Sequence, residues 1–450
     1  MNAVLFAVIT MLVLALLRVH VVVALFIGAI VGGLLSGLGL DATILAFQEG
    51  LGGGAKIALS YALLGAFAMG VASAGLPTLL AHFLVKKISS SEAANTTVVA
   101  ATKWFIIAGL LLMAVMSQNL IPVHIAFIPL LVPPLLAVMN KLRLDRRLIT
   151  CCLTFGLITT YMFVPVGFGS IYLNDILLFN ISKAGLDTAG LSIMRIMAIP
   201  AAGMFVGLLI AVFVSYRRPR DYAQAQLTEE EPEAAGELSP YKLWISVTAI
   251  IATFAVQIAT QLLGFESDGL LIGALVGLAI LLLTGAVEWN KADDVFNSGM
   301  RMMALIGFIM ITAQGFAAVL EATGEVETLV NSAANLFTDN KAAVAAVMLL
   351  VGLVVTMGIG SSFSTLPIIS VIFVPLCMSL GFSPAATVAI IGTAGALGDA
   401  GSPASDSTLG PTAGLNADGQ HDHIRDSVIP TFLHFNIPLL LAGWTAALVL

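Results

Sequence analysis

Long runs of apolar residues dominate this chain, and short polar stretches separate them. The clearest runs are long enough to cross the hydrocarbon core of a bilayer as helices, and they occupy residues 21–40, 57–83, 191–215, 243–263 and 428–450. The pattern therefore predicts an all-α polytopic membrane protein. Composition agrees, because 59% of the 450 residues are hydrophobic and only 10% are charged, against about 25% in an ordinary soluble protein. We expect no enzyme, and no basic cluster points to nucleic acid.

One polar stretch, residues 217–241, divides the chain nearly in half. It is charged and contains proline, as linkers often do. We therefore expect a first repeat over 1–216, a cytoplasmic linker over 217–241 and a second repeat over 242–450. Each repeat is predicted to hold five spans, one of them broken, and one re-entrant hairpin, which gives about ten spans and two hairpins. An odd number of crossings per repeat inverts the second repeat relative to the first, as in many secondary transporters.

Aligned segments support the duplication. SQNLIPVHIAFIPLL at 117–131 aligns with SFSTLPIISVIFVPL at 362–376. VPVGFGS at 164–170 aligns with SPASDST at 402–408. Chance similarity between apolar segments is the alternative, but the aligned segments keep a similar spacing along the chain, so one duplication explains both pairs.

The basic residues predict the orientation in the membrane. With the N-terminus outside, 15 of the 19 Lys and Arg residues fall on the cytoplasmic side, and the four outside are Lys56, Lys183, Arg195 and Lys341. This asymmetry has the sign that the positive-inside rule requires. We expect a multi-pass protein of a bacterial inner membrane with both termini in the periplasm.

Each predicted hairpin turns at a polar tip. Residues 99–140 carry basic residues at both ends, so this stretch should enter and leave from the cytoplasm, whereas residues 342–382 should enter from outside. The alternative is two continuous spans with a packing face of small residues in each stretch. The tip residues, which would offer hydroxyl and amide groups to a substrate, are Ser117, Gln118, Asn119, Ser361, Ser362, Ser364 and Thr365.

The sequence GDAGSPASDSTLGPT at 398–412 cannot form a continuous helix, although it lies in a region of span length. Asp399 and Asp406 stand out in it, because a carboxylate near the bilayer centre normally lies on an ion or substrate path. We expect both to bind a sodium ion, and protons in competition with it. Alternatively, Asp399 caps one helix and Asp406 N-caps the next. The further predicted oxygen ligands are Ser402, Ser405 and Thr408.

The corresponding break in the first half, residues 161–170, has no carboxylate. It would contribute carbonyl groups and small polar side chains instead. The residues expected to do so are Thr159, Thr160, Gly167 and Gly169.

Two histidines, His421 and His423, lie in the loop 416–427 at the predicted cytoplasmic mouth. Solvated loop histidines are the common case. Their His-x-His spacing suggests a metal, but no third ligand is evident, so a proton relay or a pH sensor is the favoured functional interpretation.

The run G-D-x-x-S-P-x-S-D-x-T from Gly398 to Thr408 resembles the signature of the NhaC-type sodium/proton antiporter family of the ion-transporter superfamily. The resemblance implies a homodimer with a scaffold and a transport unit that moves in an elevator-like shift. One departure is that Ser407 precedes Thr408 and LGPT follows, where the family usually has a second threonine and a serine-rich stretch. Some branches of the superfamily carry amino acids or carboxylates.

These observations predict a secondary active transporter that exchanges sodium for protons by an elevator-like alternating-access mechanism. It would need no cofactor, and its partners would be membrane lipid, sodium ions, protons and a second copy of the chain. The alternative is a sodium- or proton-coupled transporter of an amino acid such as histidine, or of a small carboxylate. The polar hairpin tips favour this alternative, because hydroxyls, amides and helix N-termini can hold a carboxylate.

Overall fold

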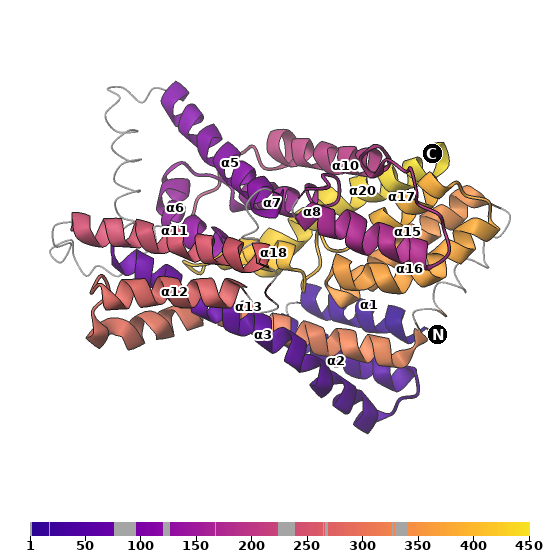
Figure 1. The fold of residues 1–450 in the computed structure, drawn as a ribbon, viewed down its shortest axis with the longest axis horizontal. Coiled ribbons are helices and arrows are strands. Elements are labelled where there is room, and N and C mark those ends of the chain that lie inside the picture. The colour runs from indigo at the N-terminus through magenta and orange to yellow at the C-terminus, as the bar shows by residue number, and fades with distance from the viewer. Residues whose placement is uncertain are drawn as a thin grey trace.

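The computed structural model is built from helices throughout its described part (Figure 1). The described residues are 2–17, 19–75, 96–119, 127–166, 168–223, 239–263, 265, 269–325, 328 and 340–450. In the first half, the elements are α1 (Ala3–Leu16), α2 (Val21–Leu35), α3 (Leu40–Ser73), α5 (Thr96–Asn119), α6 (Phe127–Lys141), α7 (Arg146–Ile158), α8 (Phe168–Ser170), η2 (Ile171–Leu178), α9 (Phe179–Lys183), α10 (Ile193–Ile210) and η3 (Ala211–Ser215).

The second half contains a similar series of helices. They are α11 (Pro240–Leu262), α12 (Gly269–Leu283), η5 (Trp289–Lys291), α13 (Ala292–Thr323), α15 (Lys341–Ile359), α16 (Ser362–Ser379), α17 (Pro384–Ala396), α18 (Asp406–Leu415), η6 (His423–Val428), α19 (Ile429–Thr431), η7 (Phe432–Asn436) and α20 (Ile437–Val449). Both termini lie toward the same end of the long axis of the molecule (Figure 1).

Seven helices of the described part are long and apolar enough to cross a membrane. They are Leu40–Ser73, Val99–Gln118, Ile193–Ser215, Pro240–Thr260, Lys341–Ile359, Ser362–Ser379 and His423–Val449. Large apolar side chains such as Phe105 and Trp244 are exposed, by 73% and 71%, and a bilayer would cover them. The prediction of an all-α, multi-pass membrane protein is confirmed.

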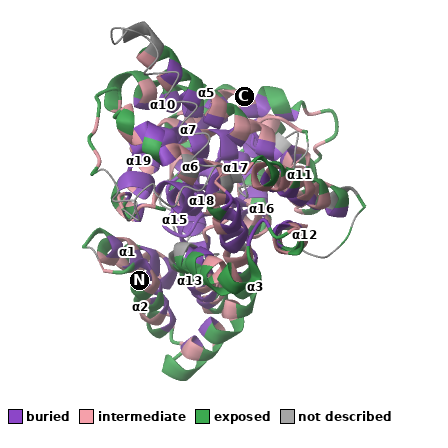
Figure 2. Ribbon diagram, turned by 90° about the vertical axis from the view of Figure 1, so that its left-hand side faces the viewer, coloured by how far each residue is buried: buried purple, intermediate pink, exposed green. Residues whose placement is uncertain are grey.

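The two longest helices, α3 and α13, come from different halves and pack against each other. Glycine permits their close approach, since a Cβ atom on Gly54 would lie 2.5 Å from the Cα atom of Ile311. Small residues let helix backbones pack in this way in membranes. Residues on α2, α3 and α11 are exposed at the periphery, whereas α17 and α18 are buried at the centre (Figure 2).

Helix α17 is buried from Ala386 to Ala396. Its start is fixed by Ser383, whose side chain accepts a hydrogen bond from the backbone N–H of Ala386 at 3.0 Å, and by Pro384 in the first turn. Such a cap satisfies an otherwise orphan donor. Helices α15, α16 and α20 pack around α17, so the chain that leaves its C-terminus enters the middle of the protein.

A buried ion pair ties the start of α7 to the loop after α18. The Arg146 side chain is 0% exposed, and its guanidinium donates to both Asp418 oxygens, at 2.6 and 2.5 Å. It also donates to the carbonyl oxygen of Leu415 at 2.7 Å. The Tyr222 ring covers the guanidinium, with 4.3 Å between the ring centroid and Cζ. The first linker residues therefore dock on this end of the protein.

Candidate functional site

The break between α17 and α18, residues 397–405, forms the backbone of the site. Gly398 has a φ of +87°, which favours glycine. A Cβ atom there would lie 2.8 Å from the Leu353 carbonyl oxygen. The Asn436 side chain accepts from the Gly398 N–H at 2.9 Å and donates to the Ala400 carbonyl at 3.2 Å. These bonds satisfy backbone polar groups that no helix pairs, as a break within a membrane requires.

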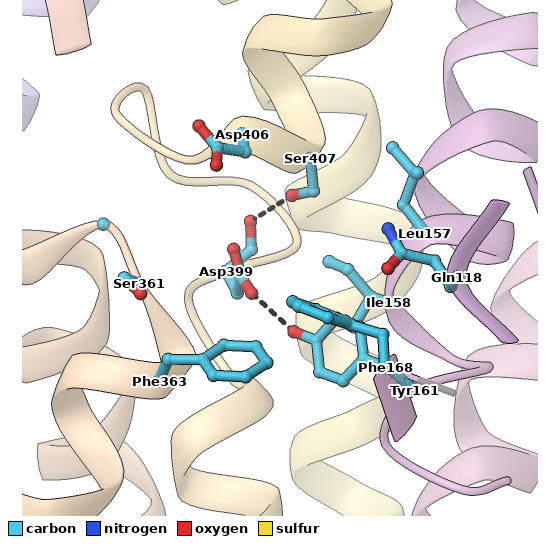
Figure 3. A pocket seen from close by; sticks show the side chains of 11 residues that line it. Gln118, Leu157, Ile158, Tyr161, Phe168, Ser361, Phe363, Asp399, Asp406 and Ser407 are labelled. Atoms are coloured by element: carbon cyan, nitrogen blue, oxygen red, sulfur yellow. Dashed lines mark hydrogen bonds between the residues drawn. The ribbon is translucent and has the colours of Figure 1, made fainter. Parts of the chain in front are cut away.

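The buried carboxylate of Asp399 accepts hydrogen bonds from three hydroxyl groups. Tyr161 and Ser362 donate to Oδ2 at 2.6 and 2.5 Å, and Ser405 donates to Oδ1. The Tyr161 and Ser362 hydroxyls lie 2.9 Å apart. Tyr161 follows α7 in the first half, Ser362 begins α16, and Ser405 precedes α18. Asp399 thus joins three parts of the chain at one point, and Figure 3 shows its hydrogen bond with Tyr161.

Asp406 faces the same cavity as Asp399 (Figure 3). No hydrogen bond links its carboxylate to another described residue. The N-cap of α18 is Ser405, which accepts from the Ser407 N–H, and the C-cap of α17 is Leu397. Neither aspartate therefore caps a helix, although Asp406 lies in the first turn of α18, where the helix dipole favours negative charge.

The cavity has a volume of about 70 Å³. A water molecule needs about 10–15 Å³ of such space, so the cavity has room for only a few of them. Sites for small organic molecules are typically about 300–1,000 Å³. The lining residues are Gln118, Leu157, Ile158, Tyr161, Phe168, Gly360, Ser361, Phe363, Asp399, Asp406 and Ser407.

Family profiles match most of the chain. The profile of a Na+/H+ antiporter family matches residues 152–444, and that of a second Na+-H+ antiporter family matches residues 2–88. The chain belongs to the Na+/H+ antiporter family. The resemblance seen in the run from Gly398 to Thr408 is therefore confirmed, and the protein is a membrane transporter of an antiporter family, not an enzyme.

Relatives that match over the whole chain occur in several bacteria. An uncharacterized membrane protein of Vibrio parahaemolyticus is 54% identical over 451 residues, which is 100% of both chains. An uncharacterized membrane protein of Haemophilus influenzae is 49% identical over 456 residues, covering 100% of this chain and 99% of the relative. A Bacillus subtilis protein named "Putative amino acid transporter YuiF" is 51% identical over 454 residues and 100% of both chains.

Two solved transporter structures are more distantly similar. The YdaH transporter of Alcanivorax borkumensis is 16% identical with a TM-score of 0.39, over 90% of this chain and 87% of that one. MtrF of Neisseria gonorrhoeae, described as one of a class of antimetabolite efflux pumps, has the same identity and TM-score, over 93% and 86% of the two chains.

Only some of the predicted site residues line the cavity. Gln118, Ser361, Asp399 and Asp406 do so, and Ser362 and Ser405 reach it through Asp399. Asn119 is the last residue of α5, and Ser364 is exposed. Gly169 is buried in α8, and Gly167 lies outside the described residues.

The other predicted hydroxyls bond to backbone carbonyls instead. Ser402 donates to Met357 at 3.1 Å, and Thr408 donates to Ser402 at 2.6 Å. Within their own helices or turns, Ser117 donates to Ala114, Thr160 to Gly156 and Thr365 to Ser361. The Thr159 hydroxyl is buried and has no hydrogen-bond partner in the described part of the protein. Ser402 and Thr408 therefore shape the break, whereas Ser405, the third hydroxyl predicted within it, contacts the Asp399 carboxylate.

Three residues that line the cavity were not predicted as site residues, namely Tyr161, Phe168 and Phe363. A signal nevertheless exists in the alignment of the two halves. The match of 164–170 with 402–408 places Tyr161 on Asp399 and Phe168 on Asp406. Tyr161 and Asp399, 238 residues apart, are joined by a hydrogen bond. The residue of the first half that aligns with this carboxylate is thus itself a site residue.

The loop histidines are buried rather than solvated. His421 lies 2.8 Å from the Ser427 hydroxyl, and Nε2 of His423 donates to the Pro403 carbonyl at 2.8 Å. Burial lowers the pKa of His421 to about 3, which argues against this residue as a sensor near neutral pH. Among the described residues, no group of three or more His, Cys, Asp or Glu side chains could hold a metal ion.

Proposed function

We propose that the protein exchanges sodium ions for protons at Asp399 and Asp406 by alternating access. The observation that carries this proposal is a cavity of about 70 Å³ that is lined by two carboxylates. Oxygen ligands suit hard cations, and the cavity is large enough for a cation stripped of most of its water. Family membership supports sodium and protons as the ions.

The carboxylates give a physical reason for coupling. An ionised carboxylate that moves through a low-dielectric environment without a counter-charge carries a large desolvation penalty. A bound sodium ion or a bound proton removes that charge. The loaded forms therefore cross readily and the empty form does not, which links sodium movement in one direction to proton movement in the other.

The hydroxyl groups around Asp399 fit both loaded states. The oxygens of Tyr161, Ser362 and Asp399 lie 2.5–2.9 Å from one another, as expected when hydroxyl hydrogens fill the space between them. When sodium binds, these hydroxyls turn their lone pairs to the ion. When a proton replaces it, the protonated carboxyl group and these hydroxyls hydrogen-bond to one another again.

The same proposal includes the inverted repeat, with two re-entrant hairpins among about ten spans, a homodimer in a bacterial inner membrane, and an elevator-like shift. The contact between counterpart residues Tyr161 and Asp399 supports it, because counterparts meet only near the axis that relates two repeats. Both termini lie toward one end of the molecule, which supports their common placement in the periplasm.

The orientation predicts which positions react from the periplasm. Cys151, Cys152 and Cys377 are buried, so an introduced cysteine would dominate the labelling. We expect a membrane-impermeant maleimide to label Lys183→Cys but not Arg218→Cys in spheroplasts, although both positions are exposed. In inside-out vesicles the two results should exchange. Labelling of Arg218→Cys in spheroplasts would refute the orientation.

A second candidate function is coupled transport of an amino acid. The Bacillus subtilis relative carries this function in its name and is 51% identical over the whole chain. The cavity is too small for an amino acid in this conformation, because organic ligands need about 300 Å³ or more. The size of the site therefore favours the cation.

Sodium-dependent proton flux decides between the two functions. We expect proteoliposomes that contain the purified protein, with a trapped pH dye and no organic solute, to show a pH change when sodium is added. Addition of histidine or a dicarboxylate should not alter the rate. Absence of flux between pH 6 and 9, together with sodium-driven uptake of a labelled amino acid, would replace antiport by symport.

A further inference from the structure

Two phenylalanine rings form one wall of the cavity (Figure 3). Phe168 belongs to α8 and Phe363 to α16, and their ring centroids are 4.7 Å apart with an angle of 37° between the planes. The Phe363 ring also packs on Tyr172, with 5.3 Å between centroids, and on Tyr161, with 5.9 Å. Tyrosines from the first half therefore hold a ring from the second half in place.

The opposite side of the cavity is polar. In the alignment of the two halves, Phe168 corresponds to Asp406, and Phe363 corresponds to Gln118. All four side chains line the same cavity. The aligned segments thus contribute an aromatic side and a polar side, although they share one ancestry in the proposed duplication.

The aromatic side faces the proposed outer surface. From Phe363, α16 runs to Ser379. From Phe168, the chain runs through α8, η2 and α9 to Lys183. Lys183 lies outside in the proposed orientation. Helix α16 packs against η2 and α9 along this path. From the polar side, α18 runs from Asp406 to Leu415, next to the proposed cytoplasmic loop 416–427. In the proposed orientation, the phenylalanine pair therefore lies on the outer side of the carboxylates.

We propose that Phe168 and Phe363 determine the specificity of the site by limiting the transported solute to a small, dehydrated cation. This inference rests on the proposed antiport. The rings leave about 70 Å³ beside the carboxylates, and they offer no oxygen or nitrogen atom to a polar organic group. A sodium or lithium ion exchanges its water for carboxylate and hydroxyl oxygens in this space. A guanidinium ion could donate to the carboxylates, but it is planar and larger, and the two rings restrict the space that its three nitrogen atoms need.

The test measures cation selectivity in proteoliposomes with a trapped pH dye. Sodium and lithium should release protons through the wild-type protein, and guanidinium should not. In Phe363→Ala and, separately, Phe168→Ala, guanidinium should release protons. The sodium concentration for half-maximal flux should rise about tenfold, as expected when a well-fitted pocket is enlarged.

Phe155→Ala is the matched control, because this ring packs on Phe205 and Phe435 at centroid distances of 6.3 Å and does not line the cavity. It should keep wild-type selectivity. Phe363→Leu keeps an apolar side chain and replaces the alanine variant in the test if that variant does not fold. It should also let guanidinium release protons. Wild-type flux with unchanged selectivity in the folded variants of both residues overturns this inference alone. A wild-type protein without sodium-dependent flux overturns the antiport and the inference together.

Discussion

We expect the Asp399→Asn protein to release no protons in response to sodium, at any pH at which the wild type is active. The amide can neither bind a proton nor neutralise a cation. The negative charge that couples sodium movement to proton movement is therefore lost. The substitution also places an NH₂ group among the hydroxyls of Tyr161, Ser362 and Ser405, which all donate to this side chain. The measurement is sodium-driven flux in proteoliposomes, with protein content matched by quantitative gel analysis.

Asp187→Asn is a matched control, since Asp187 is exposed and its side chain accepts only the backbone N–H of Ala189 among the described residues, at 2.9 Å. This variant should transport as the wild type does. Asp406→Asn should also abolish flux. If Asp406→Asn keeps the sodium dependence of the wild type, Asp406 does not bind the ion and only interacts favourably with the dipole of α18. Full activity of Asp399→Asn would refute the proposed site.

The second large effect is on stability. We expect Asp418→Asn to lower the free energy of unfolding by about 3–5 kcal/mol, because it leaves a buried guanidinium without its counter-charge. Arg146 is fully buried, and both Asp418 oxygens accept from it. The measurement is the Tm of the detergent-purified protein in a thermal unfolding experiment.

Asp221→Asn provides the comparison, because it breaks the exposed pair of Asp221 with Arg143, whose side chains are 73% and 54% exposed. Surface pairs contribute about 0–1 kcal/mol, so its Tm should barely change. Equal Tm values for the two variants would mean that the buried pair contributes no more than a surface pair.

The Arg146–Asp418 pair also predicts a pH dependence. Burial alone would raise the pKa of Asp418, but the hydrogen bonds and positive charge of Arg146 outweigh it and lower this pKa. A carboxyl whose folded pKa is depressed stabilises the protein fully above its unfolded pKa of about 4, and this contribution is lost as the pH falls through the folded value. The Tm of the wild type should therefore fall more steeply in acid than that of Asp418→Asn.

The sequence predicted the features that depend on local pattern. Apolar runs identified an all-helical membrane protein, and the glycine, proline and aspartate residues of 398–412 marked a region that interrupts the helix. Helix α17 ends at Ala396 and α18 begins at Asp406. Both boundaries follow from residues that cannot continue a helix or that cap one.

Features that depend on contacts between distant segments were not predictable in this way. Residue type does not distinguish Ser405, which bonds to Asp399, from Ser402, which bonds to the Met357 carbonyl. Tyr161 lies in an apolar stretch, and its role depends on packing between the two halves. His421 belongs to a polar loop that is typical of a solvated surface, but the adjacent helices and the docked linker bury it to 2% exposure.

The hydrogen bond between Tyr161 and Asp399 also bears on how the two halves of the chain diverged after the proposed duplication. If both halves had kept an aspartate at this position, two carboxylates would face each other at contact distance, and their repulsion would force one of them to hold a proton permanently. A phenol opposite the acid turns that repulsion into a hydrogen bond of 2.6 Å. In the proposed duplication, divergence of the two copies would have left one acid free to gain and lose its proton.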